Sequence, residues 1–275
     1  MLMWVIYFVV LISAKSFSIL LLDDHYGSRL LGSVQADENA FPYTVNYLIG
    51  ALGICGGALI SSEHILTSAS CLEGQTAVFV CIGAHDRTLL EPGQYRELVT
   101  QDRFIIHENW TVATYENNIA ILVLNGNFEM TEKIQSIGLP SRSFLEKAFQ
   151  DFNFIASGWG YAGGTHETES FLHYMNASLL PNAICRHFYA PSFTLDNICI
   201  DGSFGHSGCD GDAGGPLVLA PEVEDQNQFS SNWILVGIQS LVPQLGCEER
   251  WPTLYTRVSS YLDWIEEKTA ISIED

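Results

Sequence analysis

Nucleophilic catalysis needs a hydroxyl or thiol within hydrogen-bond reach of a base, and few such pairs stand out in this sequence. Ser70 lies between Ala69 and Cys71, with no base beside it. His64 precedes an apolar run, and His85 and His107 lie in Gly-Ala-His-Asp and Ile-Ile-His-Glu-Asn. We interpret these three histidines as structural or surface residues. The sequence therefore predicts no evident nucleophile–base pair.

Five short motifs in a fixed order carry the most specific signal. They are Cys55-Gly56-Gly57-Ala58-Leu59-Ile60, Leu66-Thr67-Ser68-Ala69-Ser70-Cys71, Asn117-Asn118-Ile119-Ala120-Ile121-Leu122, Gly158-Trp159-Gly160 and Cys209-Asp210-Gly211-Asp212-Ala213-Gly214-Gly215-Pro216.

Many short apolar or alternating runs, separated by Gly, Pro, Asn and Asp clusters, surround these motifs. This pattern predicts short strands in an all-β sandwich or barrel. A helical period occurs only near the end, at Val258, Tyr261, Leu262 and Ile265. The stretch 128–143 is predicted to cross between two halves. The predicted strands are Tyr43–Ile49, Gly57–Ser61, Ile65–Ser68, Val78–Ile82, Glu97–Ile106, Ile119–Leu124, Asn153–Ser157, Leu172–Leu179, Pro216–Leu219, Ile234–Ser240 and Thr253–Arg257.

Composition and charge limit the classes of partner. The chain has 275 residues, 47% of them hydrophobic, and a net charge of −20. That size permits a large core. The negative charge repels nucleic acid and anionic membranes, so we expect neither as a partner. The charge serves solubility or attracts basic partners, and we favour solubility.

The first residues predict secretion. An apolar run from Met1 to Ile12 is short for a membrane span and suits a signal peptide cleaved after Ser18; an uncleaved anchor is the alternative. Seven cysteines then indicate disulfides with one cysteine left over. Asn109 and Asn176 begin two glycosylation sequons.

The ordered motifs resemble those of the trypsin/chymotrypsin-like serine proteases (peptidase S1), from about Leu30 to Lys268. The resemblance implies two six-stranded antiparallel β-barrels with the active site between them and a C-terminal α-helix. It divides the chain into a signal peptide (1–18), a short propeptide (19–29) and a protease domain (30–275). The barrels then cover about 30–130 and 145–257, and the helix about 258–268. No cofactor and no metal are expected.

The three catalytic positions of that family hold other residues here. The nucleophile's position is Ala213, the base's position is Ser70, and the position of the residue that orients the base is Asn118. Alanine cannot form an acyl-enzyme, serine is a negligible base, and asparagine carries no charge to stabilise an imidazolium. By resemblance, the backbone N–H groups of Gly211 and Ala213 occupy the oxyanion-hole positions, where they serve the turn alone if no covalent chemistry remains.

The resemblance also assigns an activation site. Cleavage after Arg29 would free the amine of Leu30 to pair with Asp212. The alternative is that Asp212 stays hydrogen-bonded to the backbone in an uncleaved chain. We hold both open.

The specificity pocket departs from the family pattern, whereas the cysteine pairing follows it. The specificity pocket carries Ser207 at its floor and Val242 and Thr253 on its walls, where the family usually has glycines, so we predict a narrowed or closed pocket. The resemblance pairs the cysteines as Cys55–Cys71, Cys185–Cys199 and Cys209–Cys247, and it leaves Cys81 as a buried thiol or a partner in an intermolecular disulfide.

These observations predict a secreted serine protease homologue that is not an enzyme. Its partners would be proteins: a protease, a protease substrate, an inhibitor or another component of an extracellular protease cascade. Two alternatives stay open. One is an active serine-type endopeptidase with a non-standard site, and the other is a structural extracellular module.

Overall fold

The computed structural model describes residues 33–51, 53–143, 153–160, 168–203, 211–220, 233–242 and 251–275. The predicted leader and propeptide, Arg29, Leu30, Ser207, Cys209 and Cys247 lie outside these ranges.

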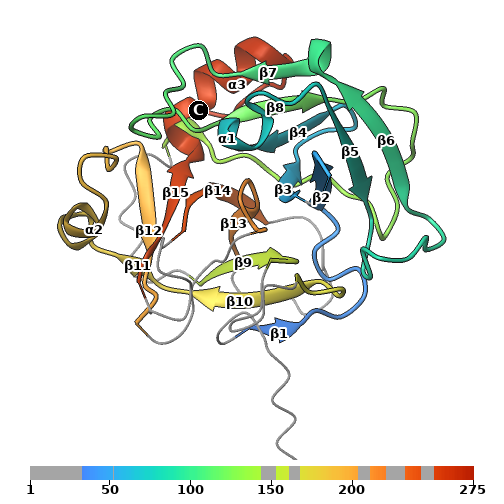
Figure 1. Cartoon of the computed structure of the whole chain (residues 1–275), viewed down its shortest axis with the longest axis horizontal. Helices are drawn as coiled ribbons and strands as arrows, with labels where there is room; N and C mark the ends of the chain where they lie inside the picture. The colour runs from blue at the N-terminus through green and yellow to red at the C-terminus, as the bar shows by residue number, and fades with distance from the viewer. Residues whose placement is uncertain are drawn as a thin grey trace, which may run out of the picture.

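The N-terminal half forms one curled antiparallel sheet, seen at the upper right of Figure 1. Alternate side chains of neighbouring strands point into the barrel, so Val45 and Tyr47 of β2 meet Val78, Val80 and Ile82 of β5 in one apolar cluster. In spatial order its strands are β6 (Tyr95–Thr100), β5 (Ala77–Ile82), β2 (Thr44–Ile49), β3 (Gly53–Leu59), β4 (His64–Thr67), β8 (Ala120–Val123) and β7 (Phe104–Ile106).

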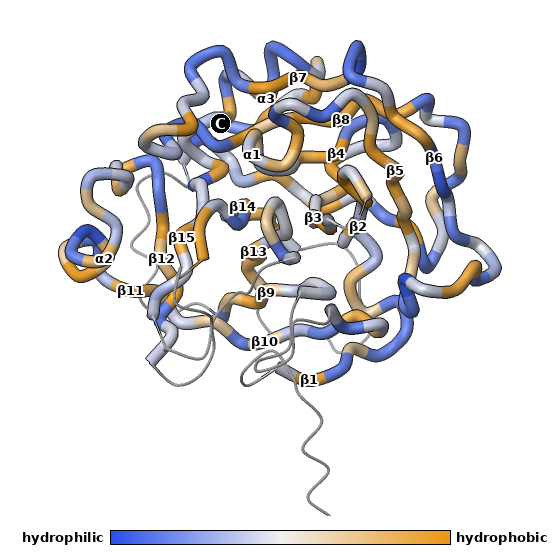
Figure 2. Tube along the Cα trace, in the orientation of Figure 1, coloured by the Kyte–Doolittle hydropathy of each residue, from blue (hydrophilic) through white to orange (hydrophobic). Residues whose placement is uncertain are grey.

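The C-terminal half forms a second curled antiparallel sheet, whose core contains Phe154, Leu217, Val236 and Tyr255. In Figure 2, apolar residues are concentrated along the strands of both sheets, and polar residues are concentrated in the outer loops. In spatial order the strands are β1 (Val34–Gln35), β10 (His173–Ala177), β9 (Phe154–Gly158), β13 (Pro216–Leu219), β14 (Ile234–Leu241), β15 (Thr253–Arg257), β12 (Asn197–Ile200) and β11 (Leu179–Leu180).

Short helices complete the fold: α1 (Ala69–Leu72), α2 (Asn182–Tyr189), α3 (Leu262–Thr269) and the 3-10 turns η1 (Gln101–Arg103) and η4 (Val258–Tyr261). The predicted helix over 258–268 begins as η4 and continues as α3, which ends at the left-handed Ala270 (φ 57°). Sequence patterns missed α2 because only Cys185 is buried there.

The predicted all-β architecture with two curled sheets and a C-terminal helix is confirmed. The N-terminal sheet has seven strands because the predicted strand Glu97–Ile106 divides into β6, η1 and β7. The second sheet has eight strands because it also contains the two-residue strands β1 and β11. One apolar cluster joins the halves, with Leu66 and Ile121 packed with Val218 and Ile238. Within the described ranges, no helix is long and apolar enough to cross a membrane.

Candidate active site

The site lies where three motifs from both halves meet. Ser70 sits in α1, directly after β4, and Asn118 lies two residues before β8. Asn118 Oδ1 accepts a hydrogen bond from the Ser70 N–H at 2.8 Å, and Asn118 Nδ2 donates to Ser70 Oγ at 3.2 Å. The same Nδ2 donates to Ser240 Oγ of β14 at 2.9 Å. Asn118 is fully buried. Its hydrogen bonds to Ser70 and Ser240 connect the two barrels, and all of these groups are neutral.

Ser240 was not among the predicted site residues. It lies 122 positions from Asn118, and their contact follows from the packing of β14 against the N-terminal half. The available signal was its place at the end of the predicted strand Ile234–Ser240, two residues before the predicted pocket residue Val242.

No titrating group joins this network in the described part of the chain. Ser70 Oγ contacts Ser68 Oγ at 3.3 Å and Asn118, with no imidazole or carboxylate in hydrogen-bond reach. The described hydrogen bond between a serine and a histidine joins Ser61 Oγ to His64 Nδ1 at 2.9 Å, in the turn between β3 and β4. Burial lowers the pKa of His64, opposed by Glu63. That pair lies at the opposite end of β4 from Ser70.

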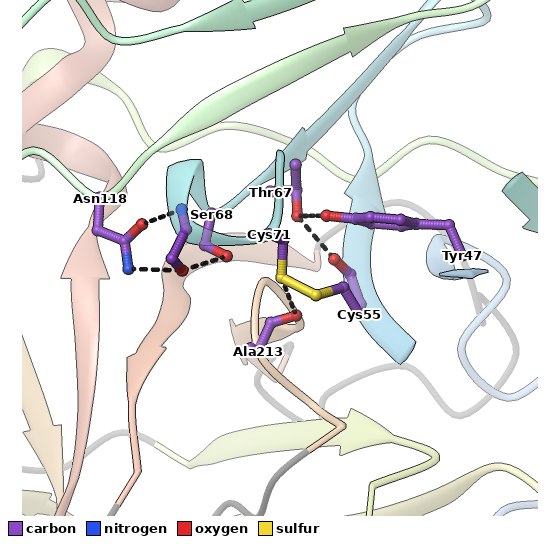
Figure 3. The surroundings of a disulfide bond; sticks show 9 residues. Tyr47, Cys55, Thr67, Ser68, Cys71, Asn118 and Ala213 are labelled. Atoms are coloured by element: carbon purple, nitrogen blue, oxygen red, sulfur yellow. Dashed lines mark hydrogen bonds between the residues drawn. A yellow bond between two sulfur atoms is a disulfide. The ribbon is translucent and has the colours of Figure 1, made fainter. Parts of the chain in front are cut away.

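The loop that carries Ala213 is pinned to the N-terminal barrel (Figure 3). The Gly56 N–H donates to the Ala213 carbonyl at 2.7 Å, and Cys71 Sγ contacts the same oxygen at 3.5 Å. Thr67 Oγ1 donates to the Gly56 carbonyl at 2.7 Å, so the Tyr47 hydroxyl, 2.6 Å away, must donate to Thr67. These contacts fix the loop without help from a side chain at position 213.

The same loop contains two glycines with left-handed backbone conformations. Gly211 and Gly214 have φ angles of 93° and 82°, which favour glycine. A Cβ atom at Gly214 would lie 2.3 Å from Thr67 Oγ1. Within the described ranges, the N–H groups of Gly211 and Ala213 donate to no protein acceptor.

Asp212 is buried beside the Gly158-Trp159-Gly160 motif. The Gly160 N–H donates to Asp212 Oδ1 at 2.7 Å. Cβ atoms at Gly158 and Gly160 would lie 2.0 and 2.2 Å from the carboxylate oxygens, so only glycine fits at either position. A cavity of about 10 Å³ next to Asp212, lined also by Met175 and Tyr255, has room for one water. The structure does not test the predicted pairing with Leu30.

The predicted pocket residues are only partly described. Thr253 is fully buried in β15, opposite Ile200 of β12, and Val242 is half-buried at the end of β14. Ser207 lies outside the described residues. A narrowed pocket therefore stays a prediction.

Two of the three implied disulfides form. Cys55 bonds to Cys71 next to the site, and Cys185 bonds to Cys199 between α2 and β12. The pair Cys209–Cys247 lies outside the described ranges. Cys81 is free and buried, and burial raises the pKa of its thiol.

Comparison with known proteins identifies the family. A family model described as Trypsin matches residues 30–265. This chain belongs to the trypsin family. Among its relatives, a brachyurin of Leptuca pugilator is 32% identical over 244 residues, covering 88% of this chain and 100% of the relative. A collagenase of Hypoderma lineatum is 32% identical over 248 residues, covering 88% of each chain. The solved structure of HL collagenase matches with a TM-score of 0.75 and 31% identity, covering 88% of this chain and 100% of that one.

This finding contradicts the prediction that the chain is not an enzyme. The relatives of this trypsin-family chain are named as a brachyurin, a collagenase and a chymotrypsin, so the family points to an enzyme. The prediction rested on the side chains at Ser70, Asn118 and Ala213 alone. In serine proteases from which the triad has been removed, the oxyanion hole and substrate binding still accelerate hydrolysis.

Proposed function

We propose that this trypsin-family chain is an endopeptidase with a non-standard site, which binds an extended polypeptide between the two barrels and hydrolyses it slowly. The proposal is supported most directly by the pinned loop at 211–215, whose N–H groups at Gly211 and Ala213 have no protein acceptor among the described residues. Family membership supports the reaction class.

The chemistry this site supports is direct attack by water. The two N–H groups hold the carbonyl oxygen as it gains negative charge. A water oxygen bonds to the carbonyl carbon, the C–N bond breaks, and a proton from water goes to the departing amine. No acyl-enzyme forms because Ala213 offers only a methyl group. We expect a rate about 10³–10⁴-fold above water and on the order of 10⁶-fold below an enzyme with the full triad.

The test is hydrolysis of a quenched fluorescent peptide library after treatment with a fluorophosphonate, which inactivates serine nucleophiles. The expected activity survives this treatment and follows the protein through two unrelated purifications. Activity that the fluorophosphonate removes comes from a contaminating serine protease. That result, or no hydrolysis above water, would overturn the proposal.

A triple variant provides the matched positive control. Ser70→His, Asn118→Asp and Ala213→Ser together restore a nucleophile, a base and an orienting carboxylate on the same scaffold. We expect hydrolysis to rise at least about 100-fold and to become sensitive to fluorophosphonate. If the triple variant folds but gains no activity, the scaffold does not position a scissile bond, and the proposed site fails with it.

A second candidate function is retention of a polypeptide partner from an extracellular protease cascade. It is favoured by the closed hydrogen-bond network of Ser70, Asn118 and Ser240, which stabilises the cleft without a reactive group. Binding of unfolded casein, measured by fluorescence anisotropy, tests it. Val242→Trp should weaken binding at least tenfold if the cleft holds the polypeptide, whereas Leu195→Trp on the exposed loop before β12 should not. Equal binding by both variants would place the contact elsewhere.

We further propose that the chain is secreted and glycosylated. Asn109 and Asn176 are both exposed, which an acceptor asparagine requires. Treatment with an asparagine-glycan-specific glycosidase should increase the electrophoretic mobility of protein from its natural source. Asn109→Gln and Asn176→Gln should each remove part of that shift, and an unchanged mobility in both would refute glycosylation.

Activation cleavage after Arg29 remains a separate proposal. It is supported by the resemblance, which places the new amine of Leu30 beside the buried Asp212. N-terminal sequencing of the natural protein should begin at Leu30, and an N-terminus found only upstream of Arg29 would refute it.

A further inference from the structure

A second cavity lies apart from the candidate active site, beneath the C-terminal tail. Its volume is about 420 Å³. Ser70, Asn118 and Ala213 take no part in its wall. Its lining comes from four segments: Ile60 after β3, the crossover at 137–139, Trp233 with Ile234 at the start of β14, and the tail at 271–274.

The walls of this tail cavity are held by backbone hydrogen bonds. Gly138 pairs with Ile234 in a parallel bridge: the Gly138 N–H donates to Trp233 O at 3.3 Å, and the Leu235 N–H donates to Gly138 O at 2.9 Å. The Ile137 N–H donates to Leu59 O at 2.8 Å. The crossover is therefore fixed against both sheets.

The tail that forms one wall of the cavity is anchored as well. The Ile271 N–H donates to Thr269 Oγ1 at 3.2 Å, and the Ile273 N–H donates to Glu266 Oε1 at 3.4 Å. The Arg142 N–H donates to Glu274 O at 2.9 Å. Because these segments are held by hydrogen bonds, a ligand that binds here would pay little conformational entropy to order the cavity walls.

The lining combines aliphatic side chains with polar groups, and the cavity is partly open to solvent. Six of its ten lining residues are isoleucine or leucine, and two of these, Ile60 and Ile137, are nearly fully buried. Ser272 and Glu274 are exposed and supply the polar groups. The neighbouring Arg142 forms ion pairs with the carboxylates of Asp263 and Glu266.

We propose that the tail cavity binds a small apolar amine, with its hydrocarbon body against the isoleucines and its ammonium group beside Glu274. The volume falls within the roughly 300–1,000 Å³ of small-molecule sites. The mostly aliphatic lining selects a hydrocarbon body, and the carboxylate selects a cation over an anion.

The test compares three probes with one chain length: octylamine, 1-octanol and octanoate. Isothermal titration at neutral pH, where octylamine is protonated, should give octylamine the highest affinity and octanoate an affinity at least tenfold lower. Glu274→Gln should reduce the preference for octylamine over 1-octanol by about fivefold. Octanoate binding as tightly as octylamine would overturn the assigned ligand class.

Filling the cavity tests its location. Ile273→Trp should reduce octylamine affinity at least tenfold, whereas Leu195→Trp, the same side chain on a distant exposed loop, should leave it unchanged. Because Ile273→Trp could disturb the tail, Ser272→Trp at the exposed edge is a second variant with the same expected loss. Undiminished octylamine binding in a folded filling variant would overturn the proposal.

Discussion

At the scale of single residues, Asn118 decides the character of the site. Its amide satisfies one backbone N–H and two hydroxyl groups from both barrels while carrying no charge. The two barrels are therefore joined here by hydrogen bonds between groups that do not titrate. An imidazole in place of Ser70 would find no carboxylate here to stabilise its charged form.

Asn118→Ala should destabilise the protein by about 2 kcal/mol, because it leaves the Ser70 N–H without its acceptor in a partly buried site. Ser70→Ala is the matched control. It removes only the hydroxyl, so we expect less than about 1 kcal/mol. Urea denaturation gives both values, and equal effects would show that the backbone contact contributes little.

Gly160→Ala should cost about 1–3 kcal/mol, since its Cβ would lie 2.2 Å from a buried carboxylate oxygen of Asp212. Gly53→Ala in the β2–β3 hairpin is the control. Its Cβ meets mainly the flexible side chain of Ile49, which can move, so a smaller loss is expected. Thermal unfolding measures the difference, and a harmless Gly160→Ala would show that Asp212 has room to shift.

At the scale of elements, one disulfide and one buried carboxylate hold the N-terminal barrel. Cys55 of β3 is bonded to Cys71 of α1, directly beneath the Ala213 carbonyl. Glu97 of β6 accepts hydrogen bonds from Tyr95, Arg103 and Asn125, which connects the strand to the segment after β8. The disulfide holds the site in place, and Glu97 holds the β6 wall of the barrel in place.

Replacing Cys55 and Cys71 by alanine should cost about 3 kcal/mol, as expected for a sequence separation of 16. The bond Cys185–Cys199, with a separation of 14, should cost about the same when removed. Only the first pair touches the loop of Ala213. Peptide hydrolysis should therefore fall in Cys55→Ala/Cys71→Ala and persist in Cys185→Ala/Cys199→Ala, while equal losses of activity would argue against the role of the loop.

Acid should weaken the β6 wall through Glu97. Burial alone would raise the pKa of Glu97, but hydrogen bonds from Tyr95, Arg103 and Asn125 lower this pKa below its usual range. A carboxyl group whose pKa is lower in the folded protein than in the unfolded chain stabilises the fold at any pH above its pKa in the unfolded chain. This stabilisation is lost as the pH falls through the pKa of the group in the folded protein. Glu97→Gln should thus be less stable than the unmodified protein at pH 7, and the gap should narrow toward pH 3. A constant gap in urea denaturation would contradict this.

At the scale of the whole molecule, net charge opposes compaction. The chain carries 32 acidic and 12 basic residues. Repulsion among exposed carboxylates destabilises the folded state and is screened by salt.

Raising sodium chloride from 10 to 150 mM should increase the midpoint of thermal unfolding by about 2–4 °C, equivalent to about 1 kcal/mol. Sucrose at matched osmolality is the control for effects that do not depend on charge. A midpoint that falls with salt would mean that local ion pairs such as Arg142–Asp263 outweigh the global repulsion.

By itself, the sequence determined the family, the all-β class and the departures from the triad at Ser70, Asn118 and Ala213, because ordered motifs and strand periodicity are local patterns. Only the tertiary structure decided which residues meet. Ser240 contacts Asn118 across 122 positions, two glycines pack against the Asp212 carboxylate, and the tail and the crossover line one cavity. These contacts depend on strand register and on how the two barrels pack. Local sequence patterns determine neither the strand register nor the packing of the barrels. Both arise from many weak interactions between segments that are distant in the chain.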